Sequence, residues 1–287
     1  MILYHAAGGG LGHLTRMRAL LHTLAIDESI TLLAPARHGA DSRVTGDVGY
    51  IPLADELAHD LPRYRRWLLE TIEEVAPSRM IVDTFPAGIL GELSALALPS
   101  DLPLELVARS LRWERYGPLL GDAPPRYARC YIVETLPPEQ RLYLEAHCEE
   151  LVEIELRDPP SDLSAEQLLA SVGLRSGAFW LIVHSGPDAE IATLISHALD
   201  AAMSEELIPR ILLISPRRPA LLDSFARDSA IVHLDIYPAT PLFPHAARII
   251  TGCGFNVMRQ TRPWRDRHHC VPFARRYDDQ ERRMRDK

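Results

Sequence analysis

The stretch Arg248-Ile249-Ile250-Thr251-Gly252-Cys253-Gly254-Phe255-Asn256 decides the predicted fold of this 287-residue chain. Its β-branched beginning predicts a short buried strand, and the residues from Phe255 to Thr261 predict the first turns of a helix. Gly252 and Gly254 let the backbone approach a ligand where a Cβ would obstruct it. A strand, a glycine turn and a helix in this order present backbone N–H groups that favour a phosphate.

A second strand and a polar cluster follow further along the chain. The run Cys270-Val271-Pro272-Phe273 predicts the strand, and Asp278-Asp279-Gln280 comes shortly after it. Carboxylates accept hydrogen bonds, and an amide both accepts and donates them. The cluster therefore suits a ligand that carries many hydroxyl groups.

These two segments resemble the nucleotide-sugar-binding signature of GT-B glycosyltransferases, a class built from two Rossmann-like domains. The matching residues are Cys253, Gly254, Phe255, Asn256, Asp279 and Gln280. The chain has Gly252 where the signature has a histidine, and Gln260 where it has a glutamate. The resemblance implies that Gln260 hydrogen-bonds the ribose of a donor. It also implies that the donor diphosphate has one side-chain partner fewer at Gly252.

Asn256 and Gln260 stand one helical turn apart and so share a helix face. Two interpretations are open for this pair. Both side chains contact a nucleotide-sugar donor together with Asp279 and Gln280, or they are ordinary polar residues on a surface helix.

A glycine-rich loop lies between the first predicted strand, Ile2-Leu3-Tyr4, and a predicted helix. The apolar stripe of that helix consists of Leu14, Met17, Leu21 and Leu24. His13 stands where a dinucleotide fingerprint needs its last glycine, and the Gly-Lys-Ser/Thr of a P-loop is absent. The remaining Gly-x-Gly-His pattern resembles the first loop of GT-B enzymes. This implies an acceptor or phosphate loop formed by Gly9, Gly10 and Gly12.

His13 and Asp83 are the candidate catalytic pair. His13 stands at a helix start, where the backbone dipole favours a neutral imidazole, and Asp83 ends the predicted strand Met80-Ile81-Val82-Asp83. The resemblance implies that His13 deprotonates an acceptor alcohol and that Asp83 orients it. Alternatively, His13 only begins the helix, or its loop holds an acceptor diphosphate as in the lipid-intermediate N-acetylglucosaminyltransferases. Asp83 in turn could cap a helix that starts near Phe85.

The segment His184-Ser185-Gly186-Pro187 occupies the place of the loop that contacts the donor diphosphate in GT-B enzymes. The hydroxyl of Ser185 and the N–H of Gly186 are possible donors to a phosphate. Asp188 and Glu190 lie in the same helical turn and would repel it, although they suit the helix dipole. A purely structural cap is the alternative for this segment.

Strand and helix alternate from Met1 to about Arg157, and the alternation restarts at Phe179. One helix is predicted from Thr84-Phe85-Pro86 onward, with Ile89, Leu90, Leu93 and Leu96 facing the core. The pattern predicts an α/β protein with two Rossmann-like domains that face each other across a cleft. We expect an acceptor-side domain at 1–158 and a short nucleotide-sugar-binding domain at 163–287, joined by the proline-containing linker 158–162.

Composition narrows the classes of partner. Apolar content of 47% and charged content of 24% are typical of a globular protein, and a net charge of −8 argues against general nucleic-acid binding. The arginine-rich segment from Arg262 to Lys287 is either a solvated surface or a contact for an anionic ligand or membrane headgroups. Four cysteines without C-x-x-C spacing, no signal peptide and no apolar span predict a cytoplasmic protein, with possible peripheral membrane contact.

The sequence thus predicts a hexosyltransferase that moves a sugar from a UDP-sugar donor to an unidentified acceptor, without a cofactor or metal. His268 and His269 are adjacent in a predicted strand and point to opposite faces, so they form no metal site. Two alternatives remain: a nucleotide-sugar hydrolase or epimerase of the same fold, and a non-catalytic nucleotide-sugar-binding protein. GT-B transferases usually continue with further helices beyond the position of Gln280, so we expect a C-terminally truncated member.

Overall fold

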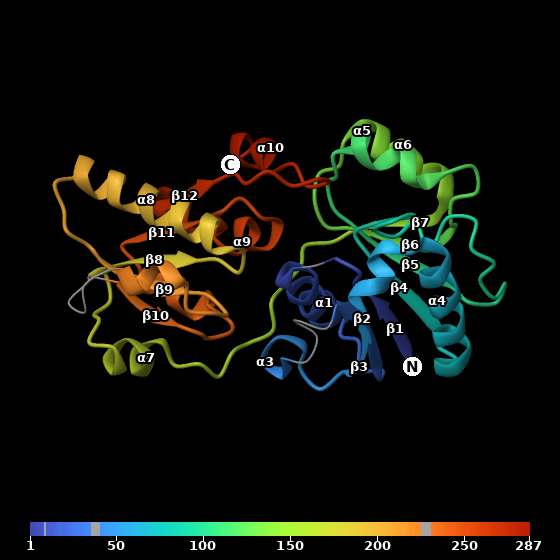
Figure 1. Cartoon of the computed structure of the whole chain (residues 1–287), viewed down its shortest axis with the longest axis horizontal. Coiled ribbons are helices and arrows are strands. Elements are labelled where there is room, and N and C mark those ends of the chain that lie inside the picture. Colours follow the sequence, from blue (N-terminus) through green and yellow to red (C-terminus); the bar gives the residue numbers. More distant parts are fainter. Residues whose placement is uncertain (9, 36–40, 225–230) are drawn as a thin grey trace. The chain divides into compact units, whose positions relative to one another are not determined.

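The computed structural model describes residues 1–8, 10–35, 41–224 and 231–287 (Figure 1). The chain divides into two compact units. Unit 1 consists of Met1–Pro159 and Arg276–Asp279, and unit 2 consists of Pro160–Arg275 and Gln280–Lys287. The chain passes between the units inside the predicted linker 158–162. The prediction of domains at 1–158 and 163–287 did not anticipate that residues 276–279 belong to unit 1.

Unit 1 is built on a seven-stranded parallel sheet with the strand order β3-β2-β1-β4-β5-β6-β7. Its strands are β1 (Ile2–His5), β2 (Ile30–Pro35), β3 (Gly49–Leu53), β4 (Arg79–Asp83), β5 (Leu104–Ala108), β6 (Tyr127–Ile132) and β7 (Cys148–Glu153). Its helices are α1 (Leu11–Thr23), α3 (Ser42–Thr45), α4 (Leu61–Val75), α5 (Trp113–Tyr116) and α6 (Pro138–His147), with the 3-10 helices η1 (Asp55–His59) and η2 (Gly117–Leu120).

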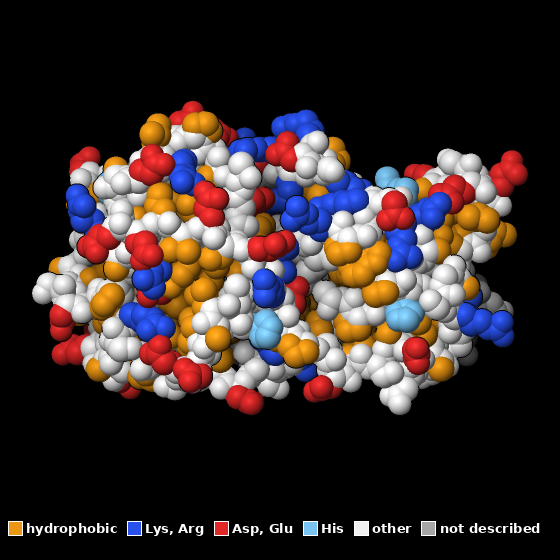
Figure 2. Space-filling view, turned by 180° about the vertical axis from the view of Figure 1, so that it is seen from behind, with side chains coloured by type: hydrophobic (Ala, Val, Ile, Leu, Met, Phe, Trp, Pro, Cys, Tyr) orange, Lys and Arg blue, Asp and Glu red, His pale blue; other side chains and the backbone are white. Residues whose placement is uncertain are grey.

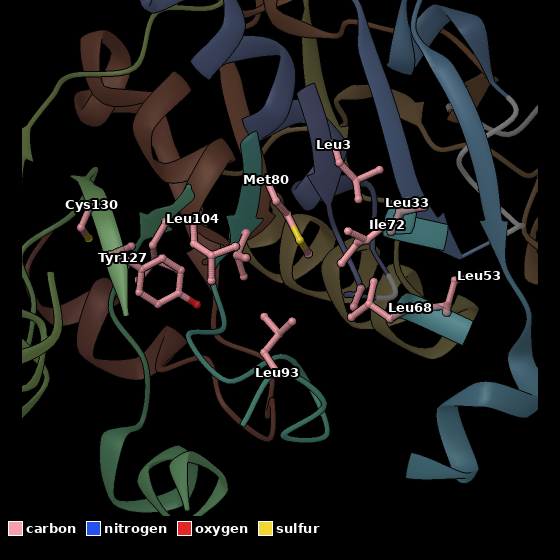
Figure 3. Close-up of a cluster of buried hydrophobic side chains, with 14 of the residues drawn as sticks. Leu3, Leu33, Leu53, Leu68, Ile72, Met80, Leu93, Leu104, Tyr127 and Cys130 are labelled. Carbon is pink, nitrogen blue, oxygen red and sulfur yellow. The ribbon is translucent and has the colours of Figure 1, made fainter. Parts of the chain in front are cut away.

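Helix α4 shows how the local sequence sets an element of unit 1. The Asp60 carboxylate accepts a hydrogen bond from the backbone N–H of Arg63 at 3.0 Å and so caps the first turn. Ala76 ends the helix in the left-handed conformation. The apolar face packs on one side of the sheet (Figure 3). The cluster there includes Leu68 and Ile72 from α4 and Leu3, Leu33 and Met80 from the strands.

The helix predicted from Phe85 is wrong, because residues 84–100 form successive turns between β4 and β5. Gly88 and Gly91 adopt φ values of 82° and 83°, which interrupt a right-handed helix. The Glu92 carboxylate accepts the backbone N–H groups of Ile89 and Leu90 at 3.2 and 2.8 Å, in place of helical carbonyls. The predicted burial of Leu93 still holds, because the turns carry it into the core (Figure 3).

Unit 2 contains a five-stranded parallel sheet with the order β10-β9-β8-β11-β12. Its strands are β8 (Phe179–Val183), β9 (Arg210–Ile214), β10 (Ile231–Leu234), β11 (Arg248–Gly252) and β12 (His268–Val271). Its helices are α7 (Ala165–Ser171), α8 (Asp188–Ser204), α9 (Phe255–Gln260) and α10 (Gln280–Arg285), with the 3-10 helices η3 (Ala220–Ser224), η4 (Thr240–His245) and η5 (Arg262–Arg267). Separate apolar clusters cover the two faces of this sheet, one under α7 and one under α8.

The two sheets share a strand order, since β10-β9-β8-β11-β12 repeats the arrangement β3-β2-β1-β4-β5. The prediction of two Rossmann-like domains is therefore confirmed. In such sheets ligands bind beyond the carboxyl ends of the strands, where the strand order reverses. That point lies between β1 and β4 in unit 1, and between β8 and β11 in unit 2. The candidate residues His13, Asp83, His184 and Gly252 all follow or end these four strands.

No helix in the described ranges combines the length and the apolar character that crossing a membrane requires. The cytoplasmic location stays a prediction.

Candidate functional site

His13 and Asp83 lie together in unit 1, as the sequence predicted. His13 belongs to the first turn of α1, and Asp83 is the last residue of β4. The Nδ1 atom of His13 forms a hydrogen bond with Oδ2 of Asp83. Because an ionised carboxylate only accepts, Nδ1 carries the hydrogen and Nε2 of a neutral ring keeps its lone pair. Among the described residues, no hydrogen bond engages Nε2.

The imidazole of His13 packs directly over Gly8. A Cβ at Gly8 would overlap the ring, so this position accepts no side chain without moving His13. The ring of Phe85 lies at 5.8 Å between centroids. The His13 side chain is 13% exposed, which leaves the ring accessible to a small reactant while the groups behind it are buried.

Asp83 is the centre of a buried hydrogen-bond network. Arg16 donates from Nε to Oδ1 at 2.7 Å and from Nη2 to Oδ2 at 2.5 Å, and the Tyr4 hydroxyl donates to Oδ1 at 3.0 Å. Burial alone would raise the pKa of Asp83, but the charges and hydrogen bonds of Arg16 and His13 lower it. The carboxylate is therefore ionised at neutral pH. With no helix after Asp83, the alternative role as a helix cap is removed.

Several groups act on His13 in opposite directions. Burial lowers the pKa of His13, the Asp83 carboxylate raises it, and the positive charges of Arg16 and Arg109 lower it again. The net result is a pKa below the ordinary value of 6.5. At neutral pH the imidazole is consequently neutral and able to accept a proton through Nε2.

The predicted loop residues Gly9, Gly10 and Gly12 surround the start of α1. Gly9 lies outside the described residues. Gly10 is the N-cap residue of α1, and its carbonyl accepts the backbone N–H of His13 at 3.2 Å. Gly12 is in the first turn, next to His13. An acceptor or phosphate role for this loop stays a prediction.

Sequence reasoning missed Arg16, and it missed that residues 276–279 return to unit 1. Arg16 stands three residues after His13, so its position on the same helix face could have been recognised. Asp278 accepts from Nη1 of Arg109 at 2.5 Å. Tyr277 packs edge-on against Tyr116, with ring centroids 5.4 Å apart. These contacts join residues more than 150 positions apart, so no local sequence pattern predicts them.

In unit 2, His184 is held by a carboxylate, which an arginine holds in turn. Its Nε2 lies 2.7 Å from Oε2 of Glu190, and Arg275 donates to both oxygens of Glu190 at 2.5 and 2.6 Å. Burial opposes ionisation of Glu190, but the hydrogen bonds from Arg275 and His184 lower its pKa. Burial lowers the pKa of His184 as well. Arg275 thus offsets the charge of Glu190, one of the two carboxylates that were expected to repel a phosphate from this loop.

The predicted glycine positions of unit 2 differ in the space around them. A Cβ at Gly252 would lie 3.2 Å from the ring of Phe273 and 3.4 Å from Cε1 of His184. A Cβ at Gly186 would collide with the His184 ring. Gly254, which precedes α9 as its N-cap, has open space where its Cβ would stand. Of these three glycines, Gly254 is the one with room for a ligand atom at the position of its missing Cβ.

The remaining predicted donor residues fall into separate places. Phe255 and Asn256 are buried in the first turn of α9, Gln260 is half-buried at its last residue, and Ser185 is exposed before α8. Asp279 belongs to unit 1, where its Oδ1 lies 3.7 Å from Nη2 of Arg112. Gln280 belongs to unit 2, where its amide oxygen accepts the backbone N–H of Phe273 at 2.9 Å. Donor binding by these residues stays a prediction.

The arginine-rich segment contributes both to the interior and to the surface of unit 2. Arg283 donates to the Cys253 carbonyl at 2.8 Å, and Lys287 donates to the His268 carbonyl. On the face shown in Figure 2, basic side chains gather over α10. His268 itself bridges the hydroxyls of Thr251 and Thr261 at 2.8 and 3.0 Å. No group of three metal-ligating side chains occurs within the described part of the chain.

Neither a protein-family model nor a curated protein matches the sequence. Solved structures of GT-B proteins do match the fold. UDP-N-acetylglucosamine 2-epimerase from Rickettsia bellii matches with a TM-score of 0.60 and 13% identity, over 91% of this chain and 76% of that one. Spinosyn forosaminyltransferase matches with a TM-score of 0.59 and 13% identity, over 98% and 81% of the two chains.

A third match is spinosyn rhamnosyltransferase solved with thymidine diphosphate. Its TM-score is 0.56 at 15% identity, over 91% of this chain and 77% of that one. The chain therefore has the fold of the GT-B superfamily, as its sequence predicted. At such low identity the likeness defines the fold, and the chemistry has to be argued from the site.

Proposed function

We propose that the protein is a nucleotide-sugar-dependent glycosyltransferase that transfers a hexose from a UDP-sugar to an acceptor hydroxyl. One observation carries this proposal. At the carboxyl end of β1 and β4, a neutral histidine presents Nε2 while its Nδ1 is held by an ionised, buried carboxylate. That arrangement is a general base for a hydroxyl group. The GT-B fold, and its likeness to a forosaminyltransferase and a rhamnosyltransferase, support the class of reaction.

In the proposed reaction, Nε2 of His13 accepts the proton of the acceptor hydroxyl as its oxygen attacks the anomeric carbon. The bond between that carbon and the diphosphate oxygen breaks, and the nucleoside diphosphate leaves with the electron pair. The Asp83 carboxylate stabilises the imidazolium that forms. His13 then releases the proton to solvent, which restores the neutral base.

We assign donor binding to unit 2 and to the returning segment. The proposed diphosphate partners are Ser185, Gly186, Gly254 and Asn256, helped by the charge of Arg275, without a metal ion. Gln260 is the proposed ribose partner, and Asp279 and Gln280 are the proposed sugar partners. Because Gln280 already bonds to Phe273, sugar binding through its amide oxygen requires that this contact is shared or exchanged.

A nucleotide-sugar hydrolase or epimerase is the second candidate. The likeness to a UDP-N-acetylglucosamine 2-epimerase favours it. The same site suits either reaction, because Nε2 of His13 can take a proton from water or from a sugar carbon as well as from an alcohol. A non-catalytic nucleotide-sugar-binding protein is the third candidate.

Calorimetric titration with UDP and with thymidine diphosphate tests the proposal. We expect saturable binding that is at least about tenfold weaker in Asn256→Ala, since lost hydrogen bonds to a charged group cost roughly 1.5–3 kcal/mol. Gln167→Ala, an exposed amide on α7, is the matched control and should bind as the wild type does. If neither nucleotide binds the wild-type protein, the proposal is wrong.

Turnover then separates the candidates. Each UDP-sugar is incubated with and without a panel of alcohol acceptors, and released UDP is measured. Release that depends on an acceptor and is lost in His13→Gln supports the transferase. Release without an acceptor identifies the hydrolase, and conversion of the sugar without release identifies the epimerase. Nucleotide binding without any of these reactions identifies the binding protein.

A further inference from the structure

Arg16 is the most enclosed cation of the site. Its side chain is only 3% exposed although it carries a permanent charge. Besides its two hydrogen bonds to Asp83, Nη2 donates to the Thr84 hydroxyl at 2.5 Å and lies 3.1 Å from Nδ1 of His13. A charge is rarely buried this fully unless it is paired, so the position of Arg16 is set by Asp83.

We propose that Arg16 is a positioning residue that keeps His13 neutral by offsetting the charge of Asp83 and by fixing the plane of its carboxylate. The inference rests on the function proposed above, because it explains how the candidate base stays ready to accept a proton. It makes the site a unit of three residues rather than a histidine–aspartate pair.

The first part of the argument is electrostatic. A lone buried carboxylate beside an imidazole favours the imidazolium, which has no lone pair on Nε2 and cannot act as a base. Here the guanidinium contacts both carboxylate oxygens, so the pair is neutral overall. The carboxylate then still accepts the Nδ1 hydrogen, and so selects the tautomer, but it no longer attracts a second proton to the ring.

The second part is geometric. Nε and Nη2 of Arg16 grip the two carboxylate oxygens, which is the fork arrangement that only arginine supplies. This grip holds the carboxylate plane with Oδ2 toward His13. A lysine at position 16 would keep the charge but would lose the second hydrogen bond. Charge and orientation can therefore be separated by substitution.

The other charged or titratable groups around His13 are paired with an opposite charge or are neutral. Arg109, which follows β5, also lowers the pKa of His13, but its own charge is paired with Asp278 of the returning segment. His5 of β1 is neutral, because burial lowers its pKa to about 4. Tyr4 of β1 is a neutral donor to Asp83, since burial raises its pKa well above 10.0. Arg16 and Asp83 thus form the dominant opposed pair.

NMR titration of His13, without nucleotide or acceptor, tests the inference apart from the proposed function. The His13 signal is assigned by its loss in His13→Gln. In the wild type we expect a midpoint below 6.5, and in Arg16→Met a midpoint above 6.5. Mere opening of the site would bring the ring only to about 6.5, the value of an unperturbed histidine. A midpoint at or below 6.5 in folded Arg16→Met overturns the inference.

Three further variants complete the test. Arg18→Met removes a half-exposed arginine of the same helix, whose Nη1 lies 3.3 Å from the Arg43 carbonyl, and should leave the midpoint unchanged. Arg16→Lys should keep the midpoint below 6.5. Asp83→Asn should move it further down, because the guanidinium then acts alone. If Arg16→Met does not fold, the last two variants decide. A midpoint above 6.5 in Arg16→Lys, or an upward shift in Asp83→Asn, overturns the inference.

The outcomes separate the two proposals. If the wild type fails to bind or turn over nucleotide sugars while the midpoints behave as expected, the proposed function is wrong and the role of Arg16 stands. In an active wild type, Arg16→Met should move the acid limb of the kcat/KM profile upward in pH. Activity that falls equally at every pH would indicate a merely structural residue.

Discussion

Each unit has a histidine after the first strand of its sheet, next to a carboxylate that an arginine contacts, yet the two clusters differ. In unit 1, His13 is bonded through Nδ1, and its carboxylate and arginine are 0% and 3% exposed. In unit 2, His184 is bonded through Nε2, and the corresponding side chains of Glu190 and Arg275 are 16% and 36% exposed. The same three types of group are thus enclosed in unit 1 and partly exposed in unit 2.

The origin of the carboxylate explains this difference. Asp83 is the last residue of β4, in the interior of the sheet, whereas Glu190 lies in the first turn of α8. A strand end holds its side chain against neighbouring strands, while a helix start faces solvent. Burial, rather than the list of residue types, thus distinguishes the two clusters. On the proposed function, we expect the enclosed cluster to tune a proton acceptor and the more exposed one to attract an anion.

The largest expected effect separates the two histidines. His13→Gln should lower kcat/KM for the productive nucleotide sugar by about 10²–10⁴-fold, the usual contribution of a general base. His184→Gln should change the dissociation constant for UDP and leave kcat within about tenfold of the wild type. Steady-state kinetics and calorimetry on both variants decide this. Equal losses of kcat in the two variants would contradict the expectation that His13 acts in the chemical step and His184 in nucleotide binding.

The next effect concerns stability. Asp83→Ala should destabilise the protein by roughly 3–5 kcal/mol, because it leaves the Arg16 charge buried without its partner. Glu190→Ala should cost only about 0–1 kcal/mol, since its partners are partly exposed and screened. Urea unfolding at pH 7.5 measures both. A similar cost for the two variants would show that burial does not distinguish the clusters.

Acidification should destabilise each unit through one buried histidine. The pKa is lowered to about 4 for His5 in unit 1 and to about 3 for His268 in unit 2, with burial the main cause. Below pH 6.5 the unfolded chain binds a proton at each histidine, while the folded chain resists protonation. The free energy of unfolding therefore decreases as the pH is lowered. From pH 7.5 to 4 each residue should cost roughly 3 kcal/mol.

Urea unfolding as a function of pH tests this expectation. The pH dependence should be shallower in His5→Gln and, separately, in His268→Gln. If the pH dependence of stability is unchanged in His5→Gln, His5 is not its source. The buried hydrogen bond between His5 and Tyr64, 2.7 Å in length, would then not depend on a neutral ring.

The smallest expected effects concern two adjacent residues, Asp279 of unit 1 and Gln280 of unit 2. Gln280→Ala should destabilise by about 1 kcal/mol, because the Phe273 N–H loses its acceptor. Asp279→Ala should cost less than about 0.5 kcal/mol, because its carboxylate is partly exposed and its contact with Arg112 is as long as 3.7 Å. Thermal unfolding resolves the two. A larger cost for Asp279 would mean that the returning segment is held by charge rather than by Tyr277.

The sequence predicted the strands well where β-branched residues run together, as in β8 and β11. It failed after Asp83, because Ile89, Leu90, Leu93 and Leu96 repeat at helical spacing while two glycines with positive φ break the helix. The pairing of His13 with Asp83 could be predicted from two short motifs. The roles of Arg16 and Asp278 could not, since a buried charge is defined by contacts that only the folded chain brings together.

The return of residues 276–279 has a consequence for how the protein is made. Tyr277 belongs to an aromatic cluster of unit 1 with Phe85 and Tyr116, so that cluster stays incomplete while a nascent chain grows. Every strand of unit 2 is synthesised before Tyr277 emerges. The amino-terminal unit, although translated first, is therefore completed only after every strand of unit 2 has been made. We expect a fragment that stops at Pro159 to expose the part of this aromatic cluster that Tyr277 covers.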